Sequence, residues 1–134
     1  PYVEELLSPV TAGLKPLVTL FQVIAPTHYV ASEESIIGIP YGRSEIHDLA
    51  SLRENYLRKV GRRLKNEGIA VTWEAPVGNA AELIVDYAER SNVNLTAMSA
   101  HGYSGFRRLF LGSVADRVLY HGNTPLLLVK PTEA

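Results

Sequence analysis

Two glycines and a serine in the last third of the chain have the types and spacing of an anion-binding site. Ser99-Ala-His-Gly102 follows an apolar run, and nine residues later Gly112 and Ser113 precede an amphipathic segment. The predicted order is strand, glycine-containing loop and helix start. A helix start presents free backbone N–H groups and the positive end of the helix dipole, which suit phosphate. The same residues also fit a loop with two turn glycines and an ordinary Ser113 helix cap, and the spacing alone leaves both interpretations open.

The segment Met98–Leu119, followed by Asn123–Lys130, resembles the C-terminal signature of the universal stress protein family. The nucleotide-binding members of that family carry Gly-x2-Gly-x9-Gly-(Ser/Thr) at this place. The chain matches the second glycine, the third glycine and the hydroxyl residue of this motif, at Gly102, Gly112 and Ser113. It departs at the first glycine, where Ser99 stands. The resemblance runs from residue 79 to 130, and more loosely back to residue 2.

The resemblance implies an adenine-nucleotide-binding regulatory module. Its ligand would be ATP, or AMP or ADP in its place, with Mg²⁺ accompanying ATP. Contacts to phosphate and ribose would fall on Gly102, Gly112, Ser113 and Val114, and contacts to the base near Val23 and on Met98 and Ser99. The family usually shows weak or no hydrolysis, so no catalytic residue is assigned. It is often dimeric through its last strand, which here is Leu126–Val129, so a homodimer is expected.

Two other functions remain open at this stage. Members of the family without the full motif act as dimerisation or signalling modules that bind no nucleotide. A small hydrolase using Ser104 or His101 has less support, because Gly102–Gly105 is one residue short of a nucleophile elbow and the helix begins much later. The four histidines do not form a spaced ligand set and no carboxylate pair supports them, so no metal site is predicted.

The composition bounds the class of protein. The 134 residues are 46% hydrophobic and 20% charged, which is typical of one globular domain. A formal net charge of −1 gives no basic footprint for nucleic acid, and no apolar run has the length of a membrane span. The N-terminal residues lack the basic region of a signal peptide, and there is no cysteine, so a cytoplasmic location is expected.

Strands and helices alternate along the chain. Apolar runs predict strands at 17–24, 95–98 and 126–129, and alternation predicts an edge strand at 69–75. Helical spacing predicts helices at 2–14, from 44 to the glycine at 68, at 79–88 and at 113–120. The long helix takes its inward face from Ile46, Leu49, Tyr56, Leu57, Val60 and Leu64. Its basic residues Lys59, Arg62, Arg63 and Lys65 suit the C-terminal end of the helix dipole. Residues 25–43 are predicted to form a long connecting segment outside the sheet. This order predicts an α/β fold with a doubly wound parallel sheet, Rossmann-like and similar to the adenine nucleotide alpha hydrolases.

The family resemblance predicts one strand that the sequence does not show. Relatives open with a central strand that ends in an acidic, nucleotide-contacting residue, whereas Pro1–Leu7 already resembles the first helix. The chain therefore reads as a single universal-stress-type domain over residues 1–134, incomplete at its N-terminus relative to the family. The strand is expected either upstream or replaced by another segment, such as Ser35–Ile39 or a partner subunit, because open sheet edges leave backbone groups unpaired.

Overall fold

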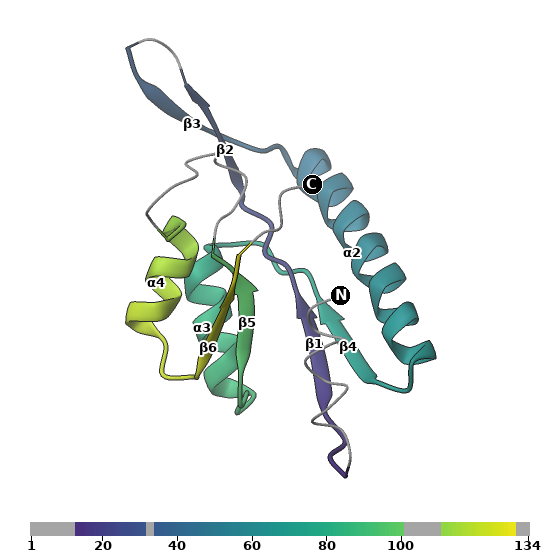
Figure 1. Ribbon diagram of the computed structural model, residues 1–134. Coiled ribbons are helices and arrows are strands. Elements are labelled where there is room, and N and C mark those ends of the chain that lie inside the picture. Colours follow the sequence, from purple (N-terminus) through teal and green to yellow (C-terminus); the bar gives the residue numbers. More distant parts are fainter. Residues whose placement is uncertain (1–12, 32–33, 101–110, 131–134) are drawn as a thin grey trace. The chain divides into compact units, whose positions relative to one another are not determined.

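The computed structural model describes residues 13–31, 34–100 and 111–130, and the predicted helix at 2–14 lies almost wholly outside them. Contacts divide the chain into two compact units, Pro1–Val77 and Gly78–Ala134. Figure 1 shows the elements of each unit. In chain order they are β1 (Leu17–Phe21), β2 (Thr27–Ala31), β3 (Ile36–Pro40), α2 (Arg43–Asn66), β4 (Ala70–Glu74), α3 (Ala80–Arg90), β5 (Thr96–Ser99), α4 (Ser113–His121) and β6 (Leu126–Val129).

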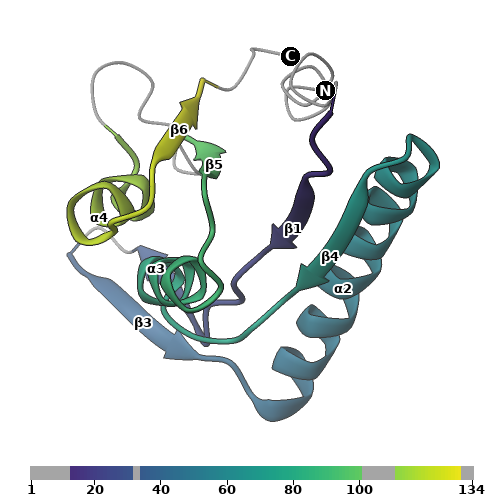
Figure 2. The same cartoon turned by 90° about the horizontal axis from the view of Figure 1, so that it is seen from below.

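In the first unit, α2 packs on a pair of parallel strands (Figures 1 and 2). Strands β1 and β4 run in register from Leu17 opposite Ala70 to Phe21 opposite Glu74. The pairing continues past the strands, where the Ile24 N–H donates to the Pro76 carbonyl at 2.8 Å. The core residues of this unit are Ile24, Leu57, Leu64 and Val71. The apolar run predicted β1 and the alternating pattern predicted β4, and the parallel pairing confirms that part of the topology.

The ends of α2 follow from local chemistry. At its start the Gly42 N–H donates to Glu45 Oε2 at 2.9 Å, so a side chain of the first turn satisfies a backbone donor outside the helix. At its end Gly68 has a φ of +84°, a conformation that favours glycine and stops the helix. The predicted inward face is wrong at Tyr56, whose side chain is 59% exposed. The buried face follows Leu57, and Tyr56 is displaced from it by about 100° around the helix.

The predicted connecting segment at 25–43 contains a β-hairpin. Strands β2 and β3 pair antiparallel, with Tyr29 opposite Gly38 and Ala31 opposite Ile36. The sequence interpretation missed these strands, because Pro26, Gly38 and Pro40 indicate turns. Its suggestion that Ser35–Ile39 substitutes for the absent family strand is also wrong, since β3 takes β2 as its partner. Apolar side chains on both faces of the hairpin are exposed: Tyr29, Val30, Ile36, Ile37 and Ile39.

The second unit sets α3 and α4 against each other beside the parallel pair of β5 and β6 (Figure 2). Asn79 caps α3, because its Oδ1 accepts the Glu82 N–H at 3.2 Å, as the capping pattern predicted. Buried alanines, Ala81, Ala88 and Ala115, let the elements of this unit approach closely. Gly122 caps the end of α4, as predicted, with its N–H on the Val118 carbonyl at 2.9 Å.

Parallel strands alternating with helices confirm the predicted α/β class. Among the described residues, β1 pairs only with β4, and β5 only with β6. The expected strand between Leu17–Ile24 and Leu95–Met98 therefore has no counterpart in the described part of the chain, and its existence elsewhere stays a prediction. None of the described helices combines the length and apolarity needed to cross a bilayer.

Candidate functional site

The predicted site lies where the chain leaves β5 and returns at α4. The register of β5 and β6 ends with Ser99 opposite Val129, and the Ala100 N–H then donates to the Val129 carbonyl at 2.9 Å. The carboxyl ends of both strands therefore meet at this edge of the pair. In open α/β sheets, ligands bind beyond the carboxyl ends of the strands.

One hydrogen bond ties the two ends of the intervening segment together. The Gly112 N–H donates to the Ala100 carbonyl at 2.7 Å, and Ala100 is buried. This bond holds Gly112, the residue directly before α4, against Ala100, the residue directly after β5. The sequence interpretation missed Ala100, and no sequence signal identifies it, because its contribution is a backbone carbonyl.

The start of α4 has a cap without a side chain. Gly112 is the N-cap residue, with a φ of −59° and a ψ of 153°, and its carbonyl accepts the Asp116 N–H at 2.9 Å. The interpretation of Ser113 as an ordinary helix cap is therefore wrong, since Ser113 is the first helical residue. As a glycine, Gly112 has no side chain that could cap the helix. Within residues 13–31, 34–100 and 111–130, the first-turn N–H groups of Ser113, Val114 and Ala115 have no acceptor outside the helix, so they suit an external one.

The helix dipole and the nearest charged side chain have opposite effects on the binding of an anion at this helix start. The helix dipole favours an anion at the N-terminus of a nine-residue helix such as α4. Asp116, in the first turn, carries a negative charge that opposes one. Ser113 is exposed at the mouth of the helix, whereas Val114 is half-buried. The arrangement can hold a phosphate group by backbone donors, with a hydroxyl beside them.

The structure brings together five of the seven predicted site residues: Met98, Ser99, Gly112, Ser113 and Val114. Met98 is half-buried within β5, and Ser99 is exposed at its end. Gly102 lies outside the described residues, as do His101 and Ser104. Val23 is half-buried in the first unit, between β1 and the Ile24 bridge to Val77.

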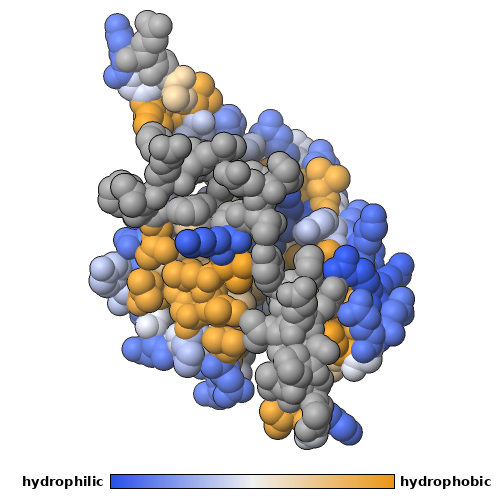
Figure 3. All heavy atoms as spheres, viewed as in Figure 1, coloured by the Kyte–Doolittle hydropathy of each residue, from blue (hydrophilic) through white to orange (hydrophobic). Residues whose placement is uncertain are grey.

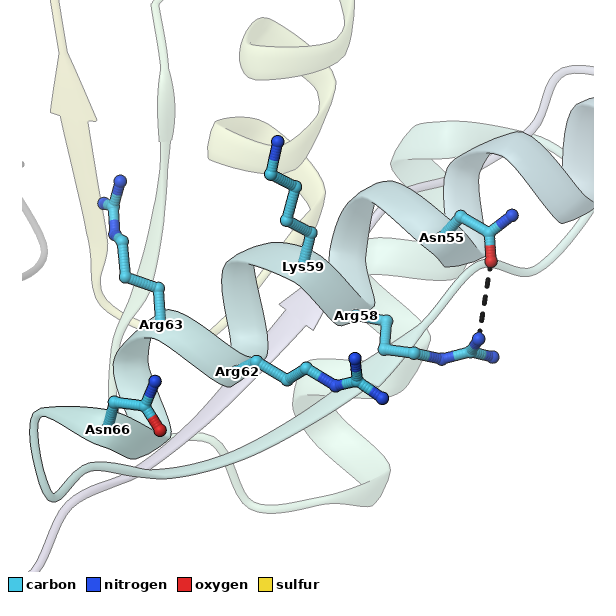
Figure 4. A pocket seen from close by; sticks show the side chains of 6 residues that line it. All are labelled: Asn55, Arg58, Lys59, Arg62, Arg63 and Asn66. Atoms are coloured by element: carbon cyan, nitrogen blue, oxygen red, sulfur yellow. Dashed lines mark hydrogen bonds between the residues drawn. The ribbon is translucent and has the colours of Figure 1, made fainter.

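The described residues also form a basic hollow that the sequence interpretation did not predict. Figure 4 shows its lining, which comes entirely from α2: Asn55, Arg58, Lys59, Arg62, Arg63 and Asn66. The sequence interpretation assigned three of its cations, Lys59, Arg62 and Arg63, to the helix dipole only. In the described residues, no three His, Asp or Glu side chains are grouped as metal ligands.

Comparison with known proteins relates the whole described fold to one family. The model of the universal stress protein family matches residues 17–130. Universal stress protein MJ0531 of Methanocaldococcus jannaschii is 32% identical over 105 residues, which are 76% of this chain and 62% of that protein. Universal stress protein Sll1388 of Synechocystis is 28% identical over 75 residues, which are 56% of this chain and 49% of that protein. The chain thus spans between about half and three fifths of the length of these relatives.

Comparison with solved structures leads to the same family and fold. The structure of protein MJ0577 of Methanocaldococcus jannaschii superimposes with a TM-score of 0.71 at 25% identity, covering 98% of this chain and 89% of that one. A universal stress family protein of Burkholderia pseudomallei gives 0.62 at 19% identity, covering 97% and 83%, and shows the fold alone. The fold is the Rossmann-like α/β fold predicted from the alternating strands and helices.

Proposed function

The chain belongs to the universal stress protein family, and on that premise we propose that it is a regulatory module that binds an adenine nucleotide. The single observation that supports this most is the glycine-capped start of α4, held at the carboxyl end of β5 by the bond between Gly112 and Ala100. It supplies backbone donors at the place where ligands of parallel sheets bind.

Phosphate and ribose would contact the loop and helix start, at Gly102, Gly112, Ser113 and Val114. A side chain at the N-cap would accept the first-turn N–H groups and compete with phosphate for them. Gly112 has none, so those donors are left to the ligand. The base would lie against Met98 and Ser99, and the base contact at Val23 stays a prediction from the family resemblance alone. ATP, ADP and AMP share these groups, and Mg²⁺ would arrive with the phosphates of ATP.

Two features predict modest affinity. Ser99 adds a Cβ and a hydroxyl where nucleotide-binding relatives carry glycine, which reduces how closely the backbone can approach the ligand. Asp116 places a carboxylate in the first turn of the helix that would hold the phosphates. We expect the protein to hydrolyse ATP slowly or not at all, since a regulatory module acts through the nucleotide-bound state.

Native mass spectrometry and calorimetric titration with ATP, ADP and AMP test the proposal. The purified protein should bind at least one of these nucleotides at a stoichiometry of one per chain. Gly112→Val should abolish the heat of binding, because its branched side chain occupies the mouth of the helix. The matched control is Gly42→Val, which adds the same side chain to the exposed glycine N-cap of α2, where φ is −67° and a Cβ has room. Equal titration curves for the Gly112 variant and the parent protein would refute the proposed site.

The second candidate function is a homodimeric signalling module joined through β6. Every residue of Leu126–Val129 is half-buried, and among the described residues this strand pairs only with β5. Figure 3 shows hydrophobic side chains gathered over these two strands. An apolar strand with an open edge favours pairing with a second copy by a two-fold axis. Sedimentation should give a dimer at micromolar concentration, and Leu127→Lys should shift it to monomer.

We also propose a cytoplasmic location, in keeping with the absence of cysteine from the chain. Fractionation of cells that produce the protein, followed by immunoblotting, tests it. Recovery in a secreted fraction would contradict it.

A further inference from the structure

The exposed face of α2 carries an unusual separation of charge. Between Asn55 and Asn66 the helix has five cations and no carboxylate: Arg58, Lys59, Arg62, Arg63 and Lys65. The chain as a whole has a net charge of −1, so this cluster is a local feature. Cations on the same helix face three and four residues apart repel one another, as Lys59 does with Arg62 and Arg63.

The helix dipole accounts for only part of this cluster. Its effect is confined to the last turn, where Arg63 and Lys65 lie. Lys65 also has a partner in the fold, because its Nζ lies 5.0 Å from the centroid of the Trp73 ring. Lys59 stands about one turn before Arg63, and Arg62 directly precedes the last turn, so the dipole contributes less to these two cations. Their positions need another explanation.

Lys59 and Arg62 have no hydrogen-bonding or ion-pair partner among the described residues. Arg58, by contrast, forms an ion pair with Glu54 at 3.0 Å and donates to the Asn55 amide oxygen at 3.4 Å. Figure 4 shows Arg58 and Arg62 extending in the same direction along the helix. Since all lining residues belong to one helix, the hollow of about 460 Å³ has a single wall. It cannot enclose a small ligand as binding pockets do, and it suits contact with another surface.

Exposed apolar residues continue the basic row. Leu52, Tyr56, Lys59 and Arg63 are spaced i, i+4, i+7 and i+11, which places them along one stripe of the helix. Leu52 is 66% exposed and Tyr56 59% exposed. The stripe therefore changes from apolar to basic over roughly 16 Å of helix at 1.5 Å per residue. Tyrosine and arginine are also among the residues enriched in protein interfaces.

From this stripe we infer that α2 docks an acidic amphipathic segment of a partner protein. Carboxylates of that segment would pair with Lys59 on the stripe and with Arg62, which lies beside it three residues after Lys59, and its apolar residues would cover Leu52 and Tyr56. Nucleic acid is the poorer match, because a phosphate backbone offers nothing to Leu52. A polyanion that followed the stripe past Leu52 would also meet the carboxylate of Asp48, four residues earlier on the same side of the helix. This inference is independent of nucleotide binding.

A display library of random 16-residue peptides, selected against the whole protein, tests the inference. Selection should enrich peptides that combine Asp or Glu with large apolar residues. One selected peptide is then labelled with fluorescein, and its dissociation constant is measured by anisotropy. Lys59→Glu/Arg62→Glu should weaken binding at least tenfold, and Tyr56→Ser several-fold. The matched control, Arg90→Glu/Arg117→Glu, reverses two exposed cations on α3 and α4 and should change binding less than twofold.

Circular dichroism establishes that each variant is folded, which is expected because every substituted side chain in the pairs is exposed. A 20-nucleotide single-stranded DNA, measured at the same salt concentration, should show no saturable binding. The inference is overturned if selection enriches no acidic peptide or if the selected peptide binds the Lys59/Arg62 variant as tightly as the parent. Tighter binding of the DNA than of the peptide would assign the stripe to nucleic acid instead.

Discussion

We predict that Gly61 cannot be replaced by a larger residue without loss of stability, although glycine is unfavourable in the interior of a helix. It lies in the interior of α2, and a Cβ built there would meet Trp73 Cε3 at 2.7 Å and Cζ3 at 2.8 Å. Alanine in a helix interior is favoured over glycine by about 1 kcal/mol. Adding a methyl group against a packed ring costs about 1–3 kcal/mol. Gly61→Ala should therefore lower the free energy of unfolding by up to about 2 kcal/mol.

Urea denaturation followed by far-ultraviolet circular dichroism measures this change. Trp73 is the sole tryptophan of the chain, so the intrinsic fluorescence of the Gly61→Ala variant also reports whether the ring has moved. The thermal midpoint should fall by roughly 2–4 °C for each kcal/mol lost.

The control places the same alanine opposite a smaller residue. In a Trp73→Leu background the two ring atoms are gone, so Gly61→Ala should raise stability by about 1 kcal/mol, the helix preference alone. The sign of the effect therefore reverses between the two backgrounds, and the double-mutant cycle isolates the contact. A stability gain in the parent protein, or the same loss in both backgrounds, would refute the steric argument.

Four further outcomes are expected. Gly68→Ala should lower stability by about 1–2 kcal/mol, measured in urea, because its φ of +84° is unfavourable for alanine; an unchanged midpoint would contradict this. Asn79→Ala should cost about 1 kcal/mol through loss of the bond to the Glu82 N–H, whereas Asn79→Asp should keep most of it. Ser99→Gly should tighten ATP binding in calorimetry, and weaker binding would mean that the serine hydroxyl contributes a contact. Ile36→Ser/Ile37→Ser should reduce binding of a hydrophobic dye while leaving the urea midpoint nearly unchanged, since both side chains are exposed.

The sequence predicted most of the elements that surround the site. The apolar runs of β1 and β6 and the periodicity of α2 and α3 reflect burial, which leaves a readable pattern. Gly68 and Asn79 mark helix ends by backbone conformation and capping chemistry, which are local and also readable. Predictions failed where the cause is distant in sequence.

Three misses show why the remainder was not predictable. The hairpin of β2 and β3 depends on pairing between segments whose prolines and glycine indicate turns. Tyr56 was assigned to the core by hydrophobicity, although its angular position on α2 turns it outward. Ser113 was considered as the cap by residue type, yet Gly112 takes that position because its N–H is held by the Ala100 carbonyl, a tertiary contact.

The bond between Ala100 and Gly112 also makes the position of α4 independent of the length of the segment between these two residues. With its two ends joined at 2.7 Å, the segment starts and finishes at one point regardless of how many residues it contains. Each doubling of a flexible loop adds only about 0.6 kcal/mol of closure entropy. Residues could thus be inserted between these ends without moving the helix start. The same frame can therefore present segments of different length and composition, so that ligand preference can change by mutation while the fold stays the same.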